Sequence, residues 1–222
     1  MNQSDITLEK IVYNIINIAS GGRSTHNEHL AEPQIEQWVH DYRALFIRRD
    51  QSRRRRQREF EQRLDSLQLS EYDDYLRTEP LPQLVRLADR EAVSHAGPDE
   101  FTAWQVVDNH SVLWRGFSKY VDSDPFVFVM DDRRIYVANS PDTEELTVRG
   151  MFENPSRVQS FLVENEQTEH DDEWRYPLPA DLIEPLIKAI LQTELNITKQ
   201  MPLDTKLDTL PDEKAVAGRP QD

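Results

Sequence analysis

The side chains with the clearest capacity for chemistry are arginines gathered in one stretch. Between residues 48 and 58, which we call the arginine-rich segment, the chain carries seven Arg and one Asp. Guanidinium groups bind carboxylates and phosphates through charge-assisted, often paired hydrogen bonds. The segment therefore predicts a contact with an acidic protein surface or with a nucleic acid. A helix face that only meets solvent explains the same residues, and the sequence leaves all three interpretations open.

The candidate contact residues are arginines in this segment or just before it. They are Arg43, Arg48, Arg49, Arg53, Arg54, Arg55, Arg56 and Arg58. In a helix, like charges four residues apart repel by about 0.2–0.5 kcal/mol per pair. We therefore expect the segment to be better ordered when a partner neutralises it.

Other residue types that could do chemistry lack the partners that chemistry needs. His26 and His29 have a spacing that metal ligands can have, but a third spaced His is missing. The run 108–111 contains Asp, His and Ser, yet neighbours within a turn cannot face one another as a catalytic relay must. Pairs of adjacent carboxylates, such as Glu144 and Glu145, are expected on any acidic surface. Nucleotide-binding and hydrolase motifs are missing, so we expect no enzyme activity, no cofactor and no metal site.

Charge is distributed unevenly along the 222 residues. The whole chain has 26 basic and 41 acidic residues, a formal charge of −15; residues 1–69 have a net charge of +1 and residues 70–222 a net charge of −16. Such a chain is a poor nucleic-acid binder as a whole, because DNA repels a net acid. It is suited to head-to-tail association, with a basic segment against the acidic surface of a neighbour.

Composition also bears on location. The longest apolar run is 126–130, far short of the ~20 residues that cross a bilayer, and the first residues lack the pattern of a signal peptide. We expect no membrane contact. The chain has no Cys, which is typical of a reducing compartment or of a particle assembled inside one.

Hydrophobic periodicity predicts helices at both ends of the chain. The first covers 6–19, with Ser4 or Asp5 as N-cap and glycines 21–22 at its end. A second begins at Pro33 and, alone or with a kink, reaches about residue 65. A third covers about 180–197, with Asp181 as N-cap, and 198–222 is expected to be a tail that orders only on a partner.

The middle of the chain predicts short strands. Runs at 104–107, 112–114, 126–130, 134–138 and 146–152 are β-branched or aromatic, and Asn154-Pro155 should close the region as a turn. We expect four to six antiparallel strands in a small sheet or barrel. In the hairpin 126–138, Ile135 and Val137 should share one face and Tyr136 the other.

The predicted fold class is α+β, with the N-terminal helices and the C-terminal helix packed as a helical layer and a small antiparallel β domain inserted between them. The expected divisions are 1–69, helical with the arginine-rich segment; 70–160, β-rich; 161–197, an acidic loop and a helix; and 198–222, an extended tail. The expected core of the helical layer consists of Ile11, Ile15, Ile35, Trp38, Val39, Tyr42, Phe46, Leu186, Ile187 and Ile190.

Two blocks of sequence resemble a known family. After a first apolar helix come a G-G-R-S turn, a helix with Y-R-A-x-x-I-R, and, near the end, Y-P-x-P before a helix. The matching positions are Gly21, Gly22, Arg23, Tyr42, Arg43, Ala44, Ile47, Arg48, Tyr176, Pro177 and Pro179. This order is similar to that of head–tail connector ring or adaptor proteins in the virions of crAss-like and similar short-tailed phages. The run of four arginines at 53–56 departs from the family pattern.

The resemblance implies a structural subunit of a closed ring, usually of twelve copies, that lies below the portal and through which DNA passes. The implied partners are copies of this chain, the portal and neighbouring tail or ring proteins, with transient non-specific DNA contact. The implied location is the head–tail junction or tail of a virion made in the host cytoplasm.

Two other functions remain open from the sequence. The arginine-rich segment could serve a DNA-binding or packaging accessory protein, whose affinity would fall steeply with salt. A hydrolase with a carboxylate site in the β-rich part is the third hypothesis.

Overall fold

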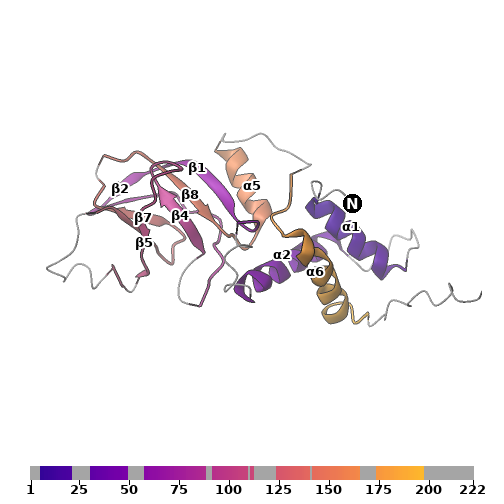
Figure 1. The fold of residues 1–222 in the computed structure, drawn as a ribbon. Coiled ribbons are helices and arrows are strands. Elements are labelled where there is room, and N and C mark those ends of the chain that lie inside the picture. The colour runs from indigo at the N-terminus through magenta and orange to yellow at the C-terminus, as the bar shows by residue number, and fades with distance from the viewer. Residues whose placement is uncertain are drawn as a thin grey trace, which may run out of the picture.

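The computed structural model describes residues 6–21, 31–49, 58–88, 92–109, 111–112, 124–140, 142–165 and 174–197. Figure 1 shows helices α1, α2 and α6 at one end of the molecule, the strands at the other, and α5 between them. The α+β class is therefore confirmed. The helices are α1 (Leu8–Ala19), α2 (Glu32–Arg49), α5 (Pro155–Glu164) and α6 (Ala180–Thr193). The strands are β1 (Gln62–Gln68), β2 (Ser70–Tyr72), β3 (Tyr75–Arg77), β4 (Val93–Gly97), β5 (Gln105–Val106), β6 (Phe126–Val129), β7 (Ile135–Ala138) and β8 (Glu145–Gly150).

The helical layer forms as its periodicity predicts, but its caps differ. Thr7 is the N-cap of α1, and its Oγ1 accepts the Lys10 backbone N–H, so the choice of Ser4 or Asp5 was wrong. Gly21 has a φ of 66° just past the end of α1, a left-handed conformation that favours glycine. Pro179 precedes α6 without a side-chain cap, and Asp181 lies within the first turn instead of capping it.

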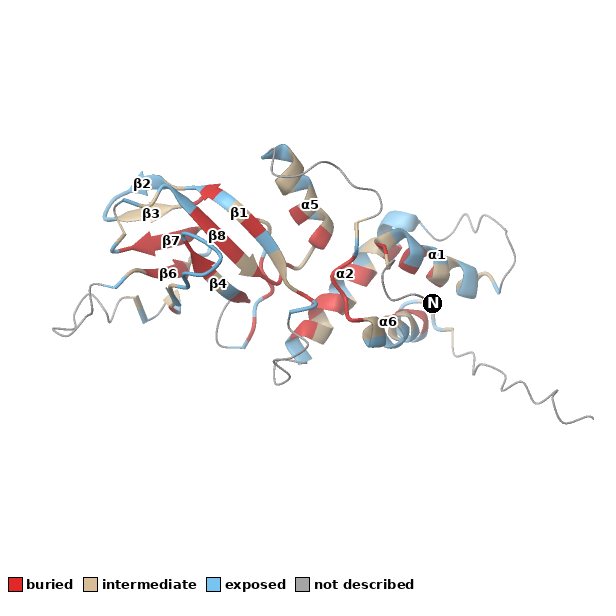
Figure 2. Ribbon diagram, turned by 45° about the horizontal axis from the view of Figure 1, so that its top comes forward, coloured by how far each residue is buried: buried red, intermediate tan, exposed pale blue. Residues whose placement is uncertain are grey.

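The core of this layer is built from the three helices together with the adjoining ends of the β part. Six of the expected core residues are buried: Ile11, Ile15, Ile35, Val39, Leu186 and Ile190. Trp38, Tyr42, Phe46 and Ile187 are half-buried and pack against the edge of the same core. The core continues into the β part through Val85, Leu87 and Met151, so the two parts share one apolar junction (Figure 2).

The β part consists of two sheets with a common core. One has the strand order β1-β8-β4 and the other β2-β3-β7-β6-β5. Buried side chains from both sheets, among them Leu64, Val148, Val127 and Val137, form a single cluster. The hairpin β6–β7 pairs Phe126 with Ala138, as the sequence predicts.

The faces of the hairpin are confirmed, and one strand direction is corrected. Ile135 and Val137 lie in the core between the sheets, and Tyr136 lies in a separate aromatic cluster on the other face. Strand β5 pairs with β6 in parallel, so the prediction of purely antiparallel strands was wrong at this edge.

The second helix is shorter than predicted. It ends at Arg49, and the apolar row that continued its register to residue 65 belongs partly to strand β1. Leu64 and Leu67 are both buried because the register of β1 against β8 shifts between them, and Ser66 there has a φ of 49°. A β-bulge of this kind inserts an extra residue and brings side chains three apart to one face, which imitates helical spacing.

Two further segments differ from expectation. Asn154 and Pro155 were predicted to form a turn, but Asn154 caps α5 and Pro155 is its first residue. An N-cap and a proline at the first position are also start signals of a helix, so the pattern fitted both structures. Of the predicted strand 112–114, Val112 lies in a helical turn and the other two residues fall outside the described ranges. The tail 198–222 also falls outside them.

Candidate assembly interface

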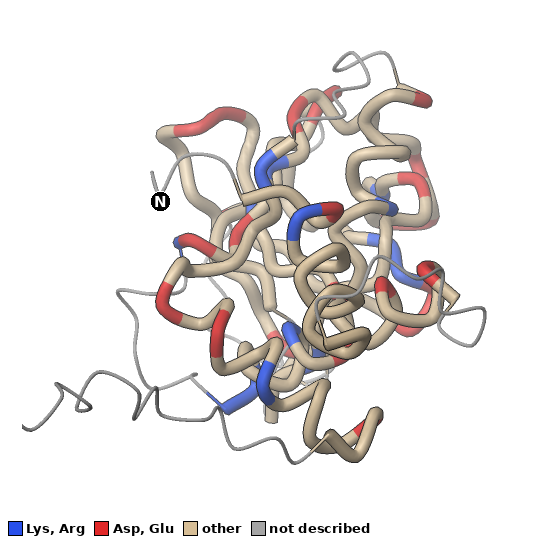
Figure 3. Tube along the Cα trace, turned by 90° about the vertical axis from the view of Figure 1, so that its right-hand side faces the viewer, with Lys and Arg blue, Asp and Glu red and all other residues tan. Residues whose placement is uncertain are grey.

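The C-terminal end of α2 carries the described part of the predicted contact surface. Arg49 is exposed at the last position of the helix, and Arg58 is exposed where the described chain resumes. Arg53, Arg54, Arg55 and Arg56 lie outside the described residues. Figure 3 shows acidic positions spread along the described trace and Lys and Arg positions in fewer places. The basic charge at this end of α2 is thus available for contact with a partner.

Arg48 is already engaged within its own chain. Its Nη2 lies 2.6 Å from Oε1 of Glu153, and its Nε donates to the carbonyl of Arg86 at 3.4 Å. Both side chains of the ion pair remain partly exposed, at 42% and 29%. An ion pair that is this exposed contributes about 0.2–1 kcal/mol, so Arg48 could exchange Glu153 for a partner at small cost.

Arg43 is in a different position from the other predicted contact residues. It has no exposed surface, because its side chain lies on the side of α2 where the helical layer meets the β part. A side chain enclosed by its own chain cannot reach a neighbouring molecule, and its proposed interface role is therefore corrected. Its Nε donates to the carbonyl of Pro177 at 2.8 Å, Nη1 to Phe152 at 2.6 Å and Nη2 to Phe60 at 2.7 Å.

These three carbonyls come from the places where the chain passes between the two parts. Phe60 precedes β1, Phe152 follows β8 and Pro177 precedes α6. We call Arg43 with these carbonyls the Arg43 junction. The fork of fixed donors in a guanidinium can satisfy several acceptors at once, which a point-like ammonium cannot. One side chain therefore joins α2 to three segments that are far apart in the sequence.

The charge of Arg43 is stabilised by dipoles and aromatic rings. Its guanidinium carbon lies 5.8 Å from the ring centre of Phe60 and 5.9 Å from that of Tyr176, within the range of cation–π attraction. Burial lowers the pKa of Arg43 to about 10, and the guanidinium stays protonated at neutral pH. It therefore acts as a fixed buried cation.

His40 and Tyr176 form a second buried polar contact next to the junction. Nδ1 of His40 and the Tyr176 hydroxyl are 2.8 Å apart, and their rings stack. Burial, together with the positive charges of Arg43 and Arg157, lowers the pKa of His40 to about 4. Burial also raises the pKa of Tyr176. Both groups are therefore neutral at physiological pH, which suits a site beside a buried cation.

The junction brings together the two sequence blocks on which the family resemblance rests. Arg43 belongs to the Y-R-A-x-x-I-R block, and Tyr176 and Pro177 belong to the Y-P-x-P block. Sequence reasoning missed the contact because all three acceptors are backbone carbonyls, which any residue carries. One signal in the sequence could have indicated that Arg43 is buried. It lies four residues after Val39 and four before Ile47, on the apolar face of α2.

The other candidate groups do not assemble into a site among the described residues. His26, His29 and His110 lie outside these residues, and the acidic pairs at 73–74, 131–132 and 144–145 are exposed. Within the described ranges, His, Asp and Glu nowhere gather in threes that could hold a metal ion. None of the helices in this part of the chain has the length and apolarity to cross a membrane.

The fold defines an α+β protein, with a helical layer joined to a β part by a buried arginine. The chain belongs to the phage tail ring protein 2 family of crAss-like phages, which its sequence matches over residues 10–213. It is therefore a structural protein of the phage virion, from a family of tail rings. The resemblance seen in the sequence is confirmed. A search of curated proteins found no match.

Proposed function

We propose that the chain is a subunit of the head–tail connector, where about twelve copies form a closed ring below the portal and DNA passes through it. The observation that carries the proposal is the family match over most of the chain. A closed ring needs a heterologous interface, in which one surface meets a different surface of the next copy. A basic end of α2 and an otherwise acidic chain supply two such surfaces.

The proposal assigns the exposed arginines to subunit or portal contacts. Arg49 and Arg58 are exposed on either side of residues 50–57, and Arg48 has an ion pair that it can exchange. Together with Arg53–Arg56 they would meet acidic groups of a neighbouring copy or of the portal. The acidic remainder would form a channel wall that does not hold phosphate, and the proposal gives the chain no catalytic step.

Light scattering of the purified protein over a range of concentrations tests ring formation. We expect a closed species near twelve times the 26.1 kDa subunit mass. Changing Arg53–Arg56 to Gln should abolish this species, and changing them to Lys should retain it, because Lys keeps the charge. A Gln variant that assembles normally, alone and in virions, would contradict the assigned role of these arginines.

A DNA-binding or packaging accessory role is the second candidate, and the seven arginines within eleven residues favour it. It predicts DNA affinity whose logarithm falls with the logarithm of salt, by a slope of about 0.9 per phosphate neutralised. The connector proposal predicts weak DNA binding that is the same for the Gln variant and the wild type.

A further inference from the structure

The most exposed large hydrophobic side chain among the described residues lies in a hydrogen-bonded loop. Phe101 is 92% exposed, between β4 and β5. We call residues 97–102 the Phe101 loop. Exposed aromatic side chains of this size are characteristic of protein interfaces, where they act as anchors.

The base of the loop is closed by Asp99 and Gly97. The Asp99 carboxylate accepts the backbone N–H groups of Phe101 at 2.6 Å and Thr102 at 2.7 Å, and the Thr102 hydroxyl at 2.9 Å. A Cβ at Gly97 would lie 1.7 Å from the Thr102 carbonyl oxygen, so only glycine allows this close approach. The hydrogen bonds from Thr102 and Phe101 lower the pKa of Asp99, which keeps the turn closed at neutral pH.

Glu100 fastens the same loop to the neighbouring sheet. Its carboxylate binds Arg63 of β1 at 3.0 Å and also pairs with Arg149 of β8. These contacts keep Glu100 against the sheet, while the next residue, Phe101, is exposed to solvent. A loop that is ordered before binding loses little conformational entropy on binding, which is what an interface anchor needs.

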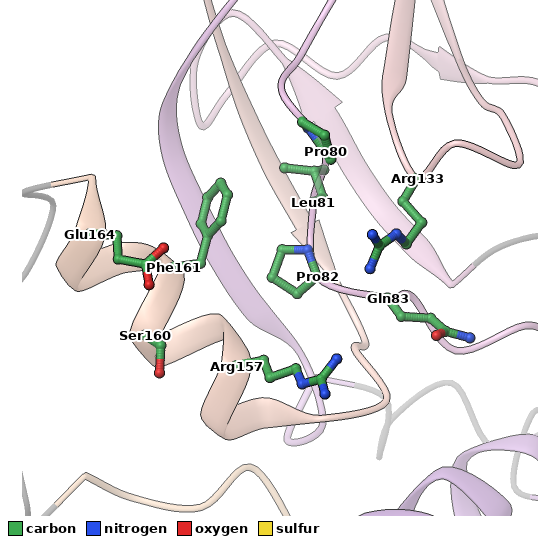
Figure 4. A pocket seen from close by; sticks show the side chains of 9 residues that line it. All are labelled: Pro80, Leu81, Pro82, Gln83, Arg133, Arg157, Ser160, Phe161 and Glu164. Atoms are coloured by element: carbon green, nitrogen blue, oxygen red, sulfur yellow. The ribbon is translucent and has the colours of Figure 1, made fainter.

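A pocket of suitable size lies on another part of the molecule. It has a volume of about 240 Å³ and lies between the segment 80–83 and helix α5. Figure 4 shows Pro82 between Phe161 on one side and Arg133 on the other. Benzene is bound by a protein cavity of ~150 Å³, so a phenyl ring has room here. We call this the α5 pocket.

The charges around the two features are complementary. Arg133 and Arg157 border the α5 pocket, and Glu164 is the one acidic residue of its lining. At the Phe101 loop, the three carboxylates of Asp65, Asp99 and Glu100 outnumber the two guanidinium groups of Arg63 and Arg149 that pair with two of them, which leaves one net negative charge. The loop and the pocket share no residue, and the high exposure of Phe101 shows that it does not occupy the pocket of its own chain.

We propose that Phe101 of one copy inserts into the α5 pocket of the next copy in the ring. The proposal rests on the proposed function, because a ring requires two different surfaces that fit each other, and this chain carries both. Each subunit then gives one anchor and receives one. Repetition of this contact gives a closed ring when the rotations between successive copies add up to a full turn.

Cysteine cross-linking tests the contact directly, because the chain has no Cys of its own. A Pro98→Cys protein, which keeps the Phe101 anchor, is mixed with a Ser160→Cys protein, since Pro98 is exposed in the Phe101 loop and Ser160 is an exposed residue of the pocket lining. We expect disulfide-linked mixed dimers after mild oxidation. The matched control replaces Ser160→Cys by Tyr13→Cys, an equally simple surface change on α1, and should give no mixed dimers. Equal yields from both mixtures, or no links at the highest concentration, would overturn the proposal.

Substitution of the anchor gives a second measurement that does not depend on cysteines. Phe101→Ala should weaken association by about 30-fold with an unchanged circular dichroism spectrum, because truncating a hot-spot side chain has an effect of this size. Tyr13→Ala, at another exposed aromatic residue, should leave association unchanged.

The outcomes separate this proposal from the ring itself. A closed ring that forms with Phe101→Ala at the same concentrations as with the wild type overturns the anchor and leaves the ring intact. Mixed dimers in open chains that never close support the anchor and contradict the ring. Cross-links in virions from Pro98→Cys only to a different tail protein would overturn the choice of a second copy as the occupant.

Discussion

Two regions of this protein use arginine in opposite ways. At the Arg43 junction, a guanidinium without exposed surface donates to three backbone carbonyls. At the Phe101 loop, Arg63 and Arg149 remain partly exposed and bind the carboxylate of Glu100. The buried arginine joins distant segments of the fold, and the exposed pair positions a loop. Burial determines the difference, because water competes for the exposed groups and cannot reach the buried one.

The largest effect is expected from removing the buried arginine. Arg43→Ala leaves three buried carbonyls without a donor and opens a cavity, so we expect a loss of about 3–5 kcal/mol in the free energy of unfolding. Arg43→Lys keeps the charge but cannot reach all three carbonyls, and it should lose less. Urea unfolding followed by fluorescence measures both. Equal stability of Arg43→Ala and the wild type would show that the junction does not hold the two parts together.

An intermediate effect is expected from pH at His40. The imidazole has a pKa of about 4 in the folded protein against 6.5 in the unfolded chain, so the unfolded state takes up the proton first as the pH falls. Stability should therefore be complete above pH 6.5 and decrease by about 2–3 kcal/mol as the pH falls toward 4.

His40→Asn provides the control for this pH dependence. Asn can still meet the Tyr176 hydroxyl but does not titrate, so the difference in stability between the two proteins should change between pH 6.5 and 4. Unfolding in urea at a series of pH values measures this difference. A difference that stays constant with pH would contradict the buried, neutral state of His40.

The smallest effect is expected at the exposed ion pair of α2. Arg48→Ala removes the contact with Glu153 and should cost about 0.2–1 kcal/mol, because the pair is partly solvated. The cost should shrink in high salt, and Arg48→Lys should restore most of it. Thermal unfolding at low and high salt measures both. A cost as large as that of Arg43→Ala would mean that exposure does not separate the two kinds of arginine.

Prediction from sequence succeeded where periodicity was long and failed where it was short. The faces of α1, α2 and α6 follow from repeated apolar spacing over several turns. Strand β1 was assigned to a helix because the bulge at Ser66 places Leu64 and Leu67 on one face. Helix α5 was missed because Asn154-Pro155 fits a turn as well as a helix start. In both cases the same local sequence pattern was compatible with two different secondary structures.

The amino-acid sequence by itself determined the helical layer, the β6–β7 hairpin, the uneven charge and the family blocks. These depend on neighbouring residues or on composition, which local physics controls. The tertiary structure alone decided that Arg43 is buried and that Phe101 is held exposed. A buried arginine and an exposed one have the same letter in the sequence, and what separates them is the arrangement of carbonyls, rings and carboxylates from distant segments.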